Sequence, residues 1–175
     1  MTGALTIRWP KPEEAEEIGR LLDVLNAHVE AETGRLTGDV VRRDLIGAER
    51  AAETLVAEFD GRLVGCATFF DSYESEHVSR GVYLLDLVVD PGARRLGVAR
   101  KLIATLSAET KRRGRNHVWW SVWPPNTGAR SFYATLGATS EEMIAQALHG
   151  EPFDTLAEEG AELDPPPIRN PSNKV

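Results

Sequence analysis

The sequence predicts an α/β (α+β) fold in which helices cover both faces of a mixed, mostly antiparallel central sheet. Two observations lead to this prediction. Segments with apolar residues at helical spacing are interleaved with β-rich runs, and their order along the chain is β, α, α, β, β, β, α, β, α, β, which is neither a βαβ repeat nor all-β. The 175 residues are also enough for one domain with a sizeable buried core.

In the first half of the chain, turn and capping signals delimit a strand, two helices and a hairpin. Glutamates follow Pro12, a combination typical of a helix start, and Asp39 is placed to cap a second, short helix that ends before residue 52. The dipeptide at 60–61, Asp-Gly, lies between two β-rich runs and predicts a hairpin. Residues 72–80 are expected to form a polar loop. The strands expected in the whole chain are residues 6–9, 54–59, 63–71, 82–89, 117–123 and 143–148.

In the second half, glycines mark where helices end. The fourth expected strand is almost continuously hydrophobic, as is typical of a strand covered on both faces. Gly114 and Gly137 each follow a segment with helical spacing, at the position where a left-handed residue ends a helix. We expect one domain over residues 1–159, and a flexible tail over residues 160–175 because of its composition. The helices expected here are residues 97–113, 126–136 and 152–159.

Composition limits the class of function. The formal net charge of −7 disfavours a nucleic-acid partner, since neutralising phosphates requires a basic surface, and it is compatible with a cationic substrate. Cys66 is the single cysteine, so neither an internal disulfide nor a cysteine zinc cluster can form, and its apolar surroundings predict a core residue. No spacing of histidines indicates a metal site. The sequence has no secretory signal and no apolar run of about 20 residues, so we expect a cytoplasmic protein without a membrane partner.

The most informative segment is the loop between the fourth strand and the third long helix. The first turn of a helix leaves backbone N–H groups unpaired and carries the positive end of the helix dipole, so it binds anions such as phosphate. Gly97 and Ala99 let a ligand approach the backbone closely. The alternative is a tight strand-to-helix turn with solvated arginines. The arginines that add positive charge here are Arg94, Arg95 and Arg100.

Residues 94–99, Arg-Arg-Leu-Gly-Val-Ala, resemble the pyrophosphate loop of the GNAT superfamily of N-acetyltransferases, which has the pattern Arg/Gln-x-x-Gly-x-Gly/Ala. Residues 123–138 resemble a second signature of that family, in which an Asn ends a strand and a helix with Phe-Tyr closes at Gly-Ala. The resemblance covers residues 5–159 and implies acetyl-CoA as cosubstrate. The residues implied to bind it are Leu87, Val88, Val89, Arg94, Arg95, Leu96, Gly97, Val98, Ala99, Arg100, Asn126 and Tyr133.

The resemblance also implies roles in acyl transfer. A backbone N–H near Val88 or Val89 stabilises the developing oxyanion of the thioester, and Tyr133 protonates the leaving sulfur. A phenol of pKa about 10 is a poor acid towards a thiolate of pKa about 8.5, so Tyr133 needs a well-aimed hydrogen bond or a perturbed pKa. Its alternative role is a core aromatic beside Phe132. Asn126 is implied to bond the pantetheine arm, to cap the following helix, or both.

The general base is harder to assign. The whole chain is most similar to diamine (spermidine/spermine-type) acetyltransferases, which carry Leu-Glu-Asp where this chain has Leu84-Leu85-Asp86. Leu85 stands where their Glu helps to deprotonate the amine, which leaves Asp86 as the catalytic candidate. Strict alternation points Asp86 to the opposite face from Leu85, but the family's strand is bulged near this point, so facing does not follow from counting. The alternative role of Asp86 is a buried structural partner.

These observations predict an N-acetyltransferase that transfers an acetyl group directly to a primary amine in a ternary complex. The amine is expected to belong to a small molecule, such as a polyamine or an amino-acid-like amine. The alternatives are a protein N-terminal or lysine acetyltransferase and a non-catalytic acyl-CoA-binding regulatory domain. Relatives often dimerise through their last strands, and the apolar strand expected at 143–148 needs cover from a partner chain or from the helix at 152–159, which favours a homodimer.

Overall fold

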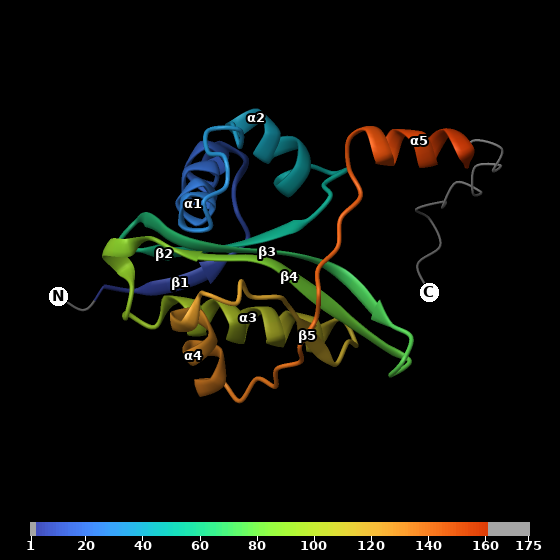
Figure 1. The fold of residues 1–175 in the computed structure, drawn as a ribbon. Helices are drawn as coiled ribbons and strands as arrows, with labels where there is room; N and C mark the ends of the chain where they lie inside the picture. Colours follow the sequence, from blue (N-terminus) through green and yellow to red (C-terminus); the bar gives the residue numbers. More distant parts are fainter. Residues whose placement is uncertain (1–2, 161–175) are drawn as a thin grey trace. The chain divides into compact units, whose positions relative to one another are not determined.

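Five strands form one sheet in the order β1-β2-β3-β4-β5 (Figure 1). The structure is a computed structural model that describes residues 3–160. Neighbouring strands are antiparallel from β1 to β4, whereas β5 runs parallel to β4. The strands are β1 (Leu5–Arg8), β2 (Glu53–Phe59), β3 (Arg62–Glu74), β4 (Ser79–Val89) and β5 (His117–Trp119).

Helices cover both faces of this sheet: Figure 1 shows α1 and α2 on one face and α3 and α4 on the other. The predicted α/β (α+β) class, with a mixed, mostly antiparallel sheet between helices, is therefore confirmed. Short segments of other helical types are the 3₁₀ turns η1 (Pro12–Glu14) and η3 (Pro91–Ala93) and the π-helical η2 (Arg42–Ile46). The α-helices are α1 (Ala15–His28), α2 (Gly38–Val41), α3 (Val98–Arg112), α4 (Thr127–Thr135) and α5 (Glu151–Glu159).

A hydrophobic cluster on each face fixes the helices to the sheet. On one face, Leu102 and Leu106 of α3 pack in the same cluster as Phe69 of β3. On the other face, Ile18 of α1 packs in a cluster with Cys66 of β3. Cys66 is fully buried, as predicted for a core residue, and burial raises the pKa of its thiol. Burial of apolar surface stabilises both layers by about 25 cal/mol per Å² removed from water.

Strands β4 and β5 pair over only three residues and then diverge. Their parallel pairing runs from Gly81 opposite His117 to Tyr83 opposite Trp119, whereas β4 continues to pair with β3 as far as Val89. Beyond this short pairing, the outer edge of β4 has no strand partner within residues 3–160. An unpaired edge presents backbone N–H and C=O groups to whatever occupies the space beside it.

Strand β4 also carries a bulge at Leu85. Thr68 of β3 pairs with Asp86 and Phe69 pairs with Leu84, so Leu85 has no residue opposite it. The bulge expected from the family resemblance is therefore present, and it breaks the alternation of side chains along β4. Leu85 is exposed although its neighbour Leu84 is buried.

One strand prediction and one loop prediction are wrong. Residues 143–148 form no strand, because their Met, Ala, Gln and Leu residues favour helix over strand and no strand within residues 3–160 lies paired with them. Residues 72–80 are not one loop, since β3 extends to Glu74 and β4 begins at Ser79. The outer face of an antiparallel hairpin tolerates polar residues, which is why this pairing does not show in the hydrophobic pattern.

Other helix and strand boundaries differ from the prediction by a capping residue or by a few residues. Thr37, not Asp39, caps α2, its hydroxyl accepting a hydrogen bond from the N–H of Val40. The strand expected over 117–123 ends at Trp119, as the chain leaves the sheet ahead of its Pro-Pro pair. Glycine signals were reliable: Gly114 and Gly137 are left-handed, with φ of +71° and +80°. The Asp-Gly turn at 60–61 joins β2 to β3 as predicted.

The chain divides into two compact units, the first ending at Ala138 and the second beginning at Thr139. The first contains the sheet, helices α1 to α4 and every predicted site residue. The described part of the second contains α5, where the short helix at 152–159 was expected. The tail expected at 160–175 lies outside the described residues except for Gly160. None of the helices in residues 3–160 is long and apolar enough to cross a membrane.

Candidate active site

The loop after β4 enters α3 through two residues in the left-handed conformation. Arg95 has a φ of +65° and Gly97 a φ of +79°, and Gly97 is the N-cap of α3. A Cβ on Gly97 would have no atom within 4 Å, so the glycine permits the backbone turn and leaves the space above it free. Such turns gather backbone N–H groups on one concave side, which suits an anion.

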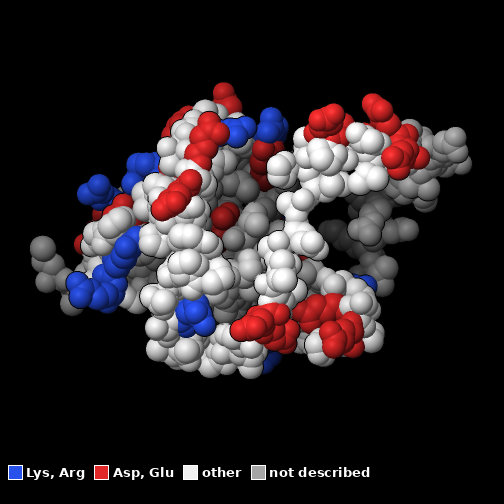
Figure 2. Space-filling model, in the orientation of Figure 1, with Lys and Arg blue, Asp and Glu red and all other residues white. Residues whose placement is uncertain are grey.

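Unpaired donors and cations surround this loop. The first N–H groups of α3 have no partner inside the helix, whose dipole makes this end positive. Figure 2 shows Lys and Arg side chains gathered at the left of the view, over the end of the first unit that carries the β4–α3 loop in Figure 1. Residues 94–99 therefore have the chemistry of a pyrophosphate-binding site. The exposed arginines of the loop and of the first turn of α3, which make no ion pair within residues 3–160, are Arg94, Arg95 and Arg100.

The backbone of β4 leads into this loop and offers hydrogen-bonding groups along its free edge. The N–H of Asp90 donates to the carbonyl of Val64 on β3 over 2.8 Å. Because backbone groups alternate between the two edges of a strand, those of Val88 also face β3. The N–H groups of Leu87 and Val89 therefore face the free edge. Val88, the alternative to Val89 in the prediction, therefore has its N–H directed at β3, and its side chain is buried in the cluster on the face of α1.

Asp86 lies beside the bulge, on the face of the sheet that carries α1. Its carboxylate accepts a hydrogen bond from the hydroxyl of Thr68 over 2.5 Å. Burial raises the pKa of Asp86, and the hydrogen bond from Thr68 partly offsets this rise. No lysine, arginine or histidine within residues 3–160 forms an ion pair with it. A raised pKa makes this carboxylate a stronger base than a solvated one, which suits a general base.

Tyr133 lies on α4, packed between aromatic rings. Its ring centroid is 5.0 Å from that of Trp120 and 5.4 Å from that of Phe132. Burial raises the pKa of Tyr133, and within residues 3–160 its hydroxyl has no hydrogen-bond partner. The ring thus packs on the core, as the structural alternative predicts, while the hydroxyl is free to donate. A raised pKa makes the phenol a weaker acid, so an aimed hydrogen bond is the route left to it.

Asn126 caps α4, because its side-chain oxygen accepts a hydrogen bond from the N–H of Ala129 over 3.0 Å. The capping alternative predicted for this residue is confirmed, and the side-chain NH₂ group is left for a ligand. Leu87, Val89 and Tyr133 pack against the same core cluster. The structure therefore brings the free edge of β4 and the phenol to one side of the sheet. The carboxylate of the base candidate lies on the other side.

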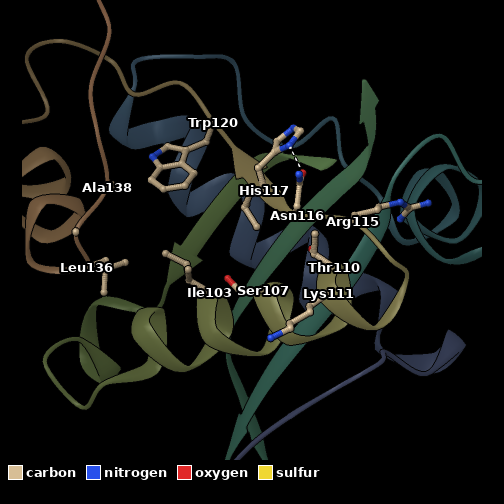
Figure 3. Close-up of a pocket in the computed structure, with 12 residues that line it drawn as sticks. Ile103, Ser107, Thr110, Lys111, Arg115, Asn116, His117, Trp120, Leu136 and Ala138 are labelled. Atoms are coloured by element: carbon tan, nitrogen blue, oxygen red, sulfur yellow. Dashed lines mark hydrogen bonds between the residues drawn. The ribbon is translucent and has the colours of Figure 1, made fainter. Parts of the chain in front are cut away.

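A cavity of about 580 Å³ lies between α3, β5 and the end of α4. Figure 3 shows Ile103 and Ser107 of α3 facing Trp120 across it, with Leu136 at one end and Lys111 at the rim. None of the residues predicted to bind acetyl-CoA or to act in catalysis lines this cavity. The candidate active site is therefore defined by the free edge of β4 and the loop at 94–99, and this cavity is not part of it.

Comparisons with known proteins identify the family. The model of the acetyltransferase (GNAT) family matches residues 20–138, a span that includes the loop at 94–99. The chain belongs to this family. Among curated proteins, the probable N-acetyltransferase 14 of Danio rerio is 34% identical over 90 residues, which are 51% of this chain and 31% of that protein. The chain thus spans about a third of the length of the curated relative that it matches.

Solved structures share the fold. An integron cassette protein from the mobile metagenome of V. cholerae is 17% identical, with a TM-score of 0.74 over 88% of this chain and 98% of that one. An aminoglycoside N-acetyltransferase in complex with CoA is 21% identical, with a TM-score of 0.70 over 85% and 97%. A ribosomal-protein-alanine N-acetyltransferase from Brucella melitensis biovar Abortus is 24% identical, with a TM-score of 0.68 over 84% and 100%.

Proposed function

We propose that this protein is an acetyl-CoA-dependent N-acetyltransferase whose acceptor is a primary amine of a small molecule. One observation carries the proposal: the free edge of β4 leads, through the short turn η3, into the left-handed loop and the positive end of α3. Acetyl-CoA has a matching order of groups, with its thioester and pantetheine amides followed by a pyrophosphate. Membership of the acetyltransferase (GNAT) family supports the same cosubstrate.

Both backbone N–H groups and side chains are proposed to bind acetyl-CoA. Acetyl-CoA supplies the activated acetyl group. The N–H groups of Leu87 and Val89 bind the thioester carbonyl and stabilise the charge that its oxygen gains during attack. The side-chain NH₂ group of Asn126 bonds the pantetheine arm. The N–H groups of residues 94–99 bind the pyrophosphate, together with the arginines of the loop.

Acid and base act from opposite faces of the sheet. Asp86 takes a proton from the ammonium group of the acceptor, directly or through a water molecule. The amine nitrogen then bonds to the acetyl carbon, the carbon–sulfur bond breaks, and Tyr133 donates a proton to the departing sulfur. The nitrogen of the new amide gives up its remaining extra proton, which returns through water to Tyr133. Strand β4 pairs with β5 over only three residues, so we propose that the reacting groups meet at the free edge of β4, where the acid can act from one face and the base from the other.

The nature of the acceptor is the finer part of the proposal. Small amines are favoured over polyamines, because the exposed Leu85 replaces the acid that diamine-type relatives carry. A protein N-terminus is the second candidate, favoured by the likeness to a ribosomal-protein-alanine N-acetyltransferase. A non-catalytic CoA-binding domain is a weaker alternative, since a binder has no use for the unpartnered phenol of Tyr133. We also propose a cytoplasmic homodimer with its catalytic domain in residues 1–159.

The test is a thiol-release assay in which acetyl-CoA is offered with small primary amines, polyamines, aminoglycosides and peptides with free N-termini. We expect release of CoA with at least one small amine and formation of the N-acetyl product by mass spectrometry. CoA binding without turnover on any acceptor would instead support the regulatory domain. Turnover on peptides alone would favour the second candidate.

A further inference from the structure

An aromatic strip lies on the face of the sheet opposite α3. Phe69, Val82 and Val118 pack with the cluster beneath α3. Their neighbours Phe70, Tyr83 and Trp119 therefore point to the other face, because successive side chains of a strand alternate. We call these three residues the aromatic strip. Phe70 is 40% exposed, and the other two are half-buried.

One ring contact within the strip and one hydrogen bond to a neighbouring residue hold Phe70 and Tyr83 in place. The rings of Phe70 and Tyr83, which face each other across β3 and β4, are stacked with centroids 5.4 Å apart. The hydroxyl of Tyr83 lies 2.9 Å from that of Ser121, which follows β5. An aromatic surface held this rigidly loses little conformational entropy when it binds a flat apolar group.

The strip begins next to the proposed base. On this face, the pair formed by Thr68 and Asp86 is followed directly by the pair formed by Phe70 and Tyr83. Two residues of a strand span about 6.6 Å. An amine at the carboxylate of Asp86 therefore places the first atoms of its carbon skeleton over these rings.

Beyond Asp86, the sheet offers no second carboxylate close by. The next acid on this face of β3, β4 and β5 is Glu74, about 13 Å past Phe70 by strand geometry. Glu74 is already engaged, with its carboxylate oxygens 3.3 Å from Nδ1 of His77 and 3.4 Å from Nε2 of His117. A second ammonium group over the strip would lose water without gaining an anionic partner from the sheet, which is unfavourable.

We propose, on the basis of the proposed function, that the acceptor is a primary monoamine with a planar apolar group a few carbons from its nitrogen. The nitrogen lies at Asp86 and the planar group lies on the aromatic strip. Apolar contact with Phe70 and Tyr83 stabilises this acceptor. Diamines are disfavoured by their second charge, and polyhydroxylated amines are disfavoured because their hydroxyl groups would face aromatic carbon instead of water.

The experiment compares three amines as acceptors: phenethylamine, putrescine and glucosamine. We expect kcat/KM for phenethylamine to exceed that for each of the other two by about tenfold or more, the discrimination that burial of an apolar group provides. Tyr83→Ala should lower kcat/KM for phenethylamine by about tenfold, with KM for acetyl-CoA unchanged. Tyr83→Phe keeps the ring and should keep most of the activity.

The matched control is Tyr73→Ala. Tyr73 lies on the same β3 strand as Phe70 but three positions further along, so it faces the opposite side, and it is 61% exposed. This variant should leave kcat/KM for phenethylamine unchanged. Melting temperatures of all variants report whether each remains folded, and Phe70→Leu provides a milder change to the strip should Tyr83→Ala unfold.

Calorimetry of amine binding to the protein saturated with CoA, read together with the kinetic comparison, distinguishes failure of the acceptor assignment from failure of the proposed catalysis. A higher kcat/KM for putrescine or glucosamine than for phenethylamine would overturn the assignment of the acceptor and leave acetyl transfer standing. Phenethylamine binding that depends on Tyr83, without thiol release from any amine, would support the strip and overturn the proposed catalysis. An equal loss of activity in Tyr83→Ala and Tyr73→Ala would count against the strip.

Discussion

At the scale of single residues, Asp86 combines burial with a single hydrogen-bond partner. Its pKa is raised above the ordinary value of 3.8, so the folded protein binds this proton more tightly than the unfolded chain does. The contribution of Asp86 to the free energy of unfolding is therefore fully present below about 3.8 and is lost as the pH rises through its folded pKa. The charged form of Asp86 is thus costly to the folded state, which is typical of an acid retained for chemistry.

We predict that Asp86→Asn strongly lowers kcat/KM at neutral pH without lowering the melting temperature. The amide can still accept the hydrogen bond of Thr68, and it removes a charge that is costly to bury. Melting temperatures and kcat/KM measured against pH provide the check. A variant with the parent's pH profile would remove Asp86 from the mechanism, and a large loss of stability at pH 7 would make it a structural acid.

Thr68→Val tests the role of Asp86 by removing the hydroxyl that donates a hydrogen bond to its carboxylate. Thr68 is fully buried, and its hydroxyl favours the charged form of Asp86. Without this hydroxyl the pKa of Asp86 should rise further, so the acidic limb of kcat/KM should move to higher pH. An unmoved acidic limb in a folded Thr68→Val variant would show that another group controls it.

Tyr133 is proposed as a proton donor, whereas Asp86 is proposed as a proton acceptor. A phenol with a raised pKa stays protonated throughout the neutral range, so Tyr133 keeps the proton that it is proposed to donate. Tyr133→Phe should keep the ring packing against Trp120 and most of the affinity for CoA. It should lower kcat by about 100-fold, the typical loss of one general acid. Tyr73→Phe is the control, since that hydroxyl lies on an exposed side chain of β3. Full activity in Tyr133→Phe would leave solvent as the proton donor.

At the scale of elements, local signals predicted most of the first unit. Helices α1 and α3 follow from apolar residues at helical spacing, and left-handed glycines end α3 and α4 where predicted. The last residues of β3, 72–74, and the first residues of β4, 79–81, do not follow from the sequence pattern, because they depend on pairing between polar segments. The contact between Thr68 and Asp86 was missed for a related reason. It requires the register of β3 and β4 and the exact place of the bulge, which are non-local.

The proposed pyrophosphate-binding role of the loop before α3 depends on one glycine. Gly97→Gln should weaken CoA binding measured by calorimetry, by about tenfold or more, because the new side chain fills the free space above the first turn of α3 and strains its positive φ. Gly114→Gln is the matched control. Gly114 follows the other end of α3 with a φ of +71° and equally open space, so this variant has the same strain without touching the loop. Equal CoA affinity of the two variants would contradict the assignment.

At the scale of the whole molecule, the second unit changes the argument for a dimer. The segment at 143–148 was expected to need a partner because it was expected to be an edge strand, and it is not a strand. Its apolar side chains are nevertheless exposed, with Ile144 at 91% and Met143 at 72%, and α5 exposes Phe153 and Leu156. Apolar side chains gathered in one short unit favour burial against another chain.

We therefore predict a homodimer whose contact includes Ile144. Light scattering at micromolar concentration should give a mass of about 38 kDa, twice the 19.2 kDa of one chain. Ile144→Lys should shift the mass towards that of the monomer, because a buried, unpaired charge opposes association. Ala145→Lys adds the same charge at the neighbouring exposed position while removing little apolar surface, and it should perturb the dimer less. A parent protein that is monomeric throughout this concentration range would refute the prediction, and an unchanged dimer mass in Ile144→Lys would place the contact elsewhere on the molecule.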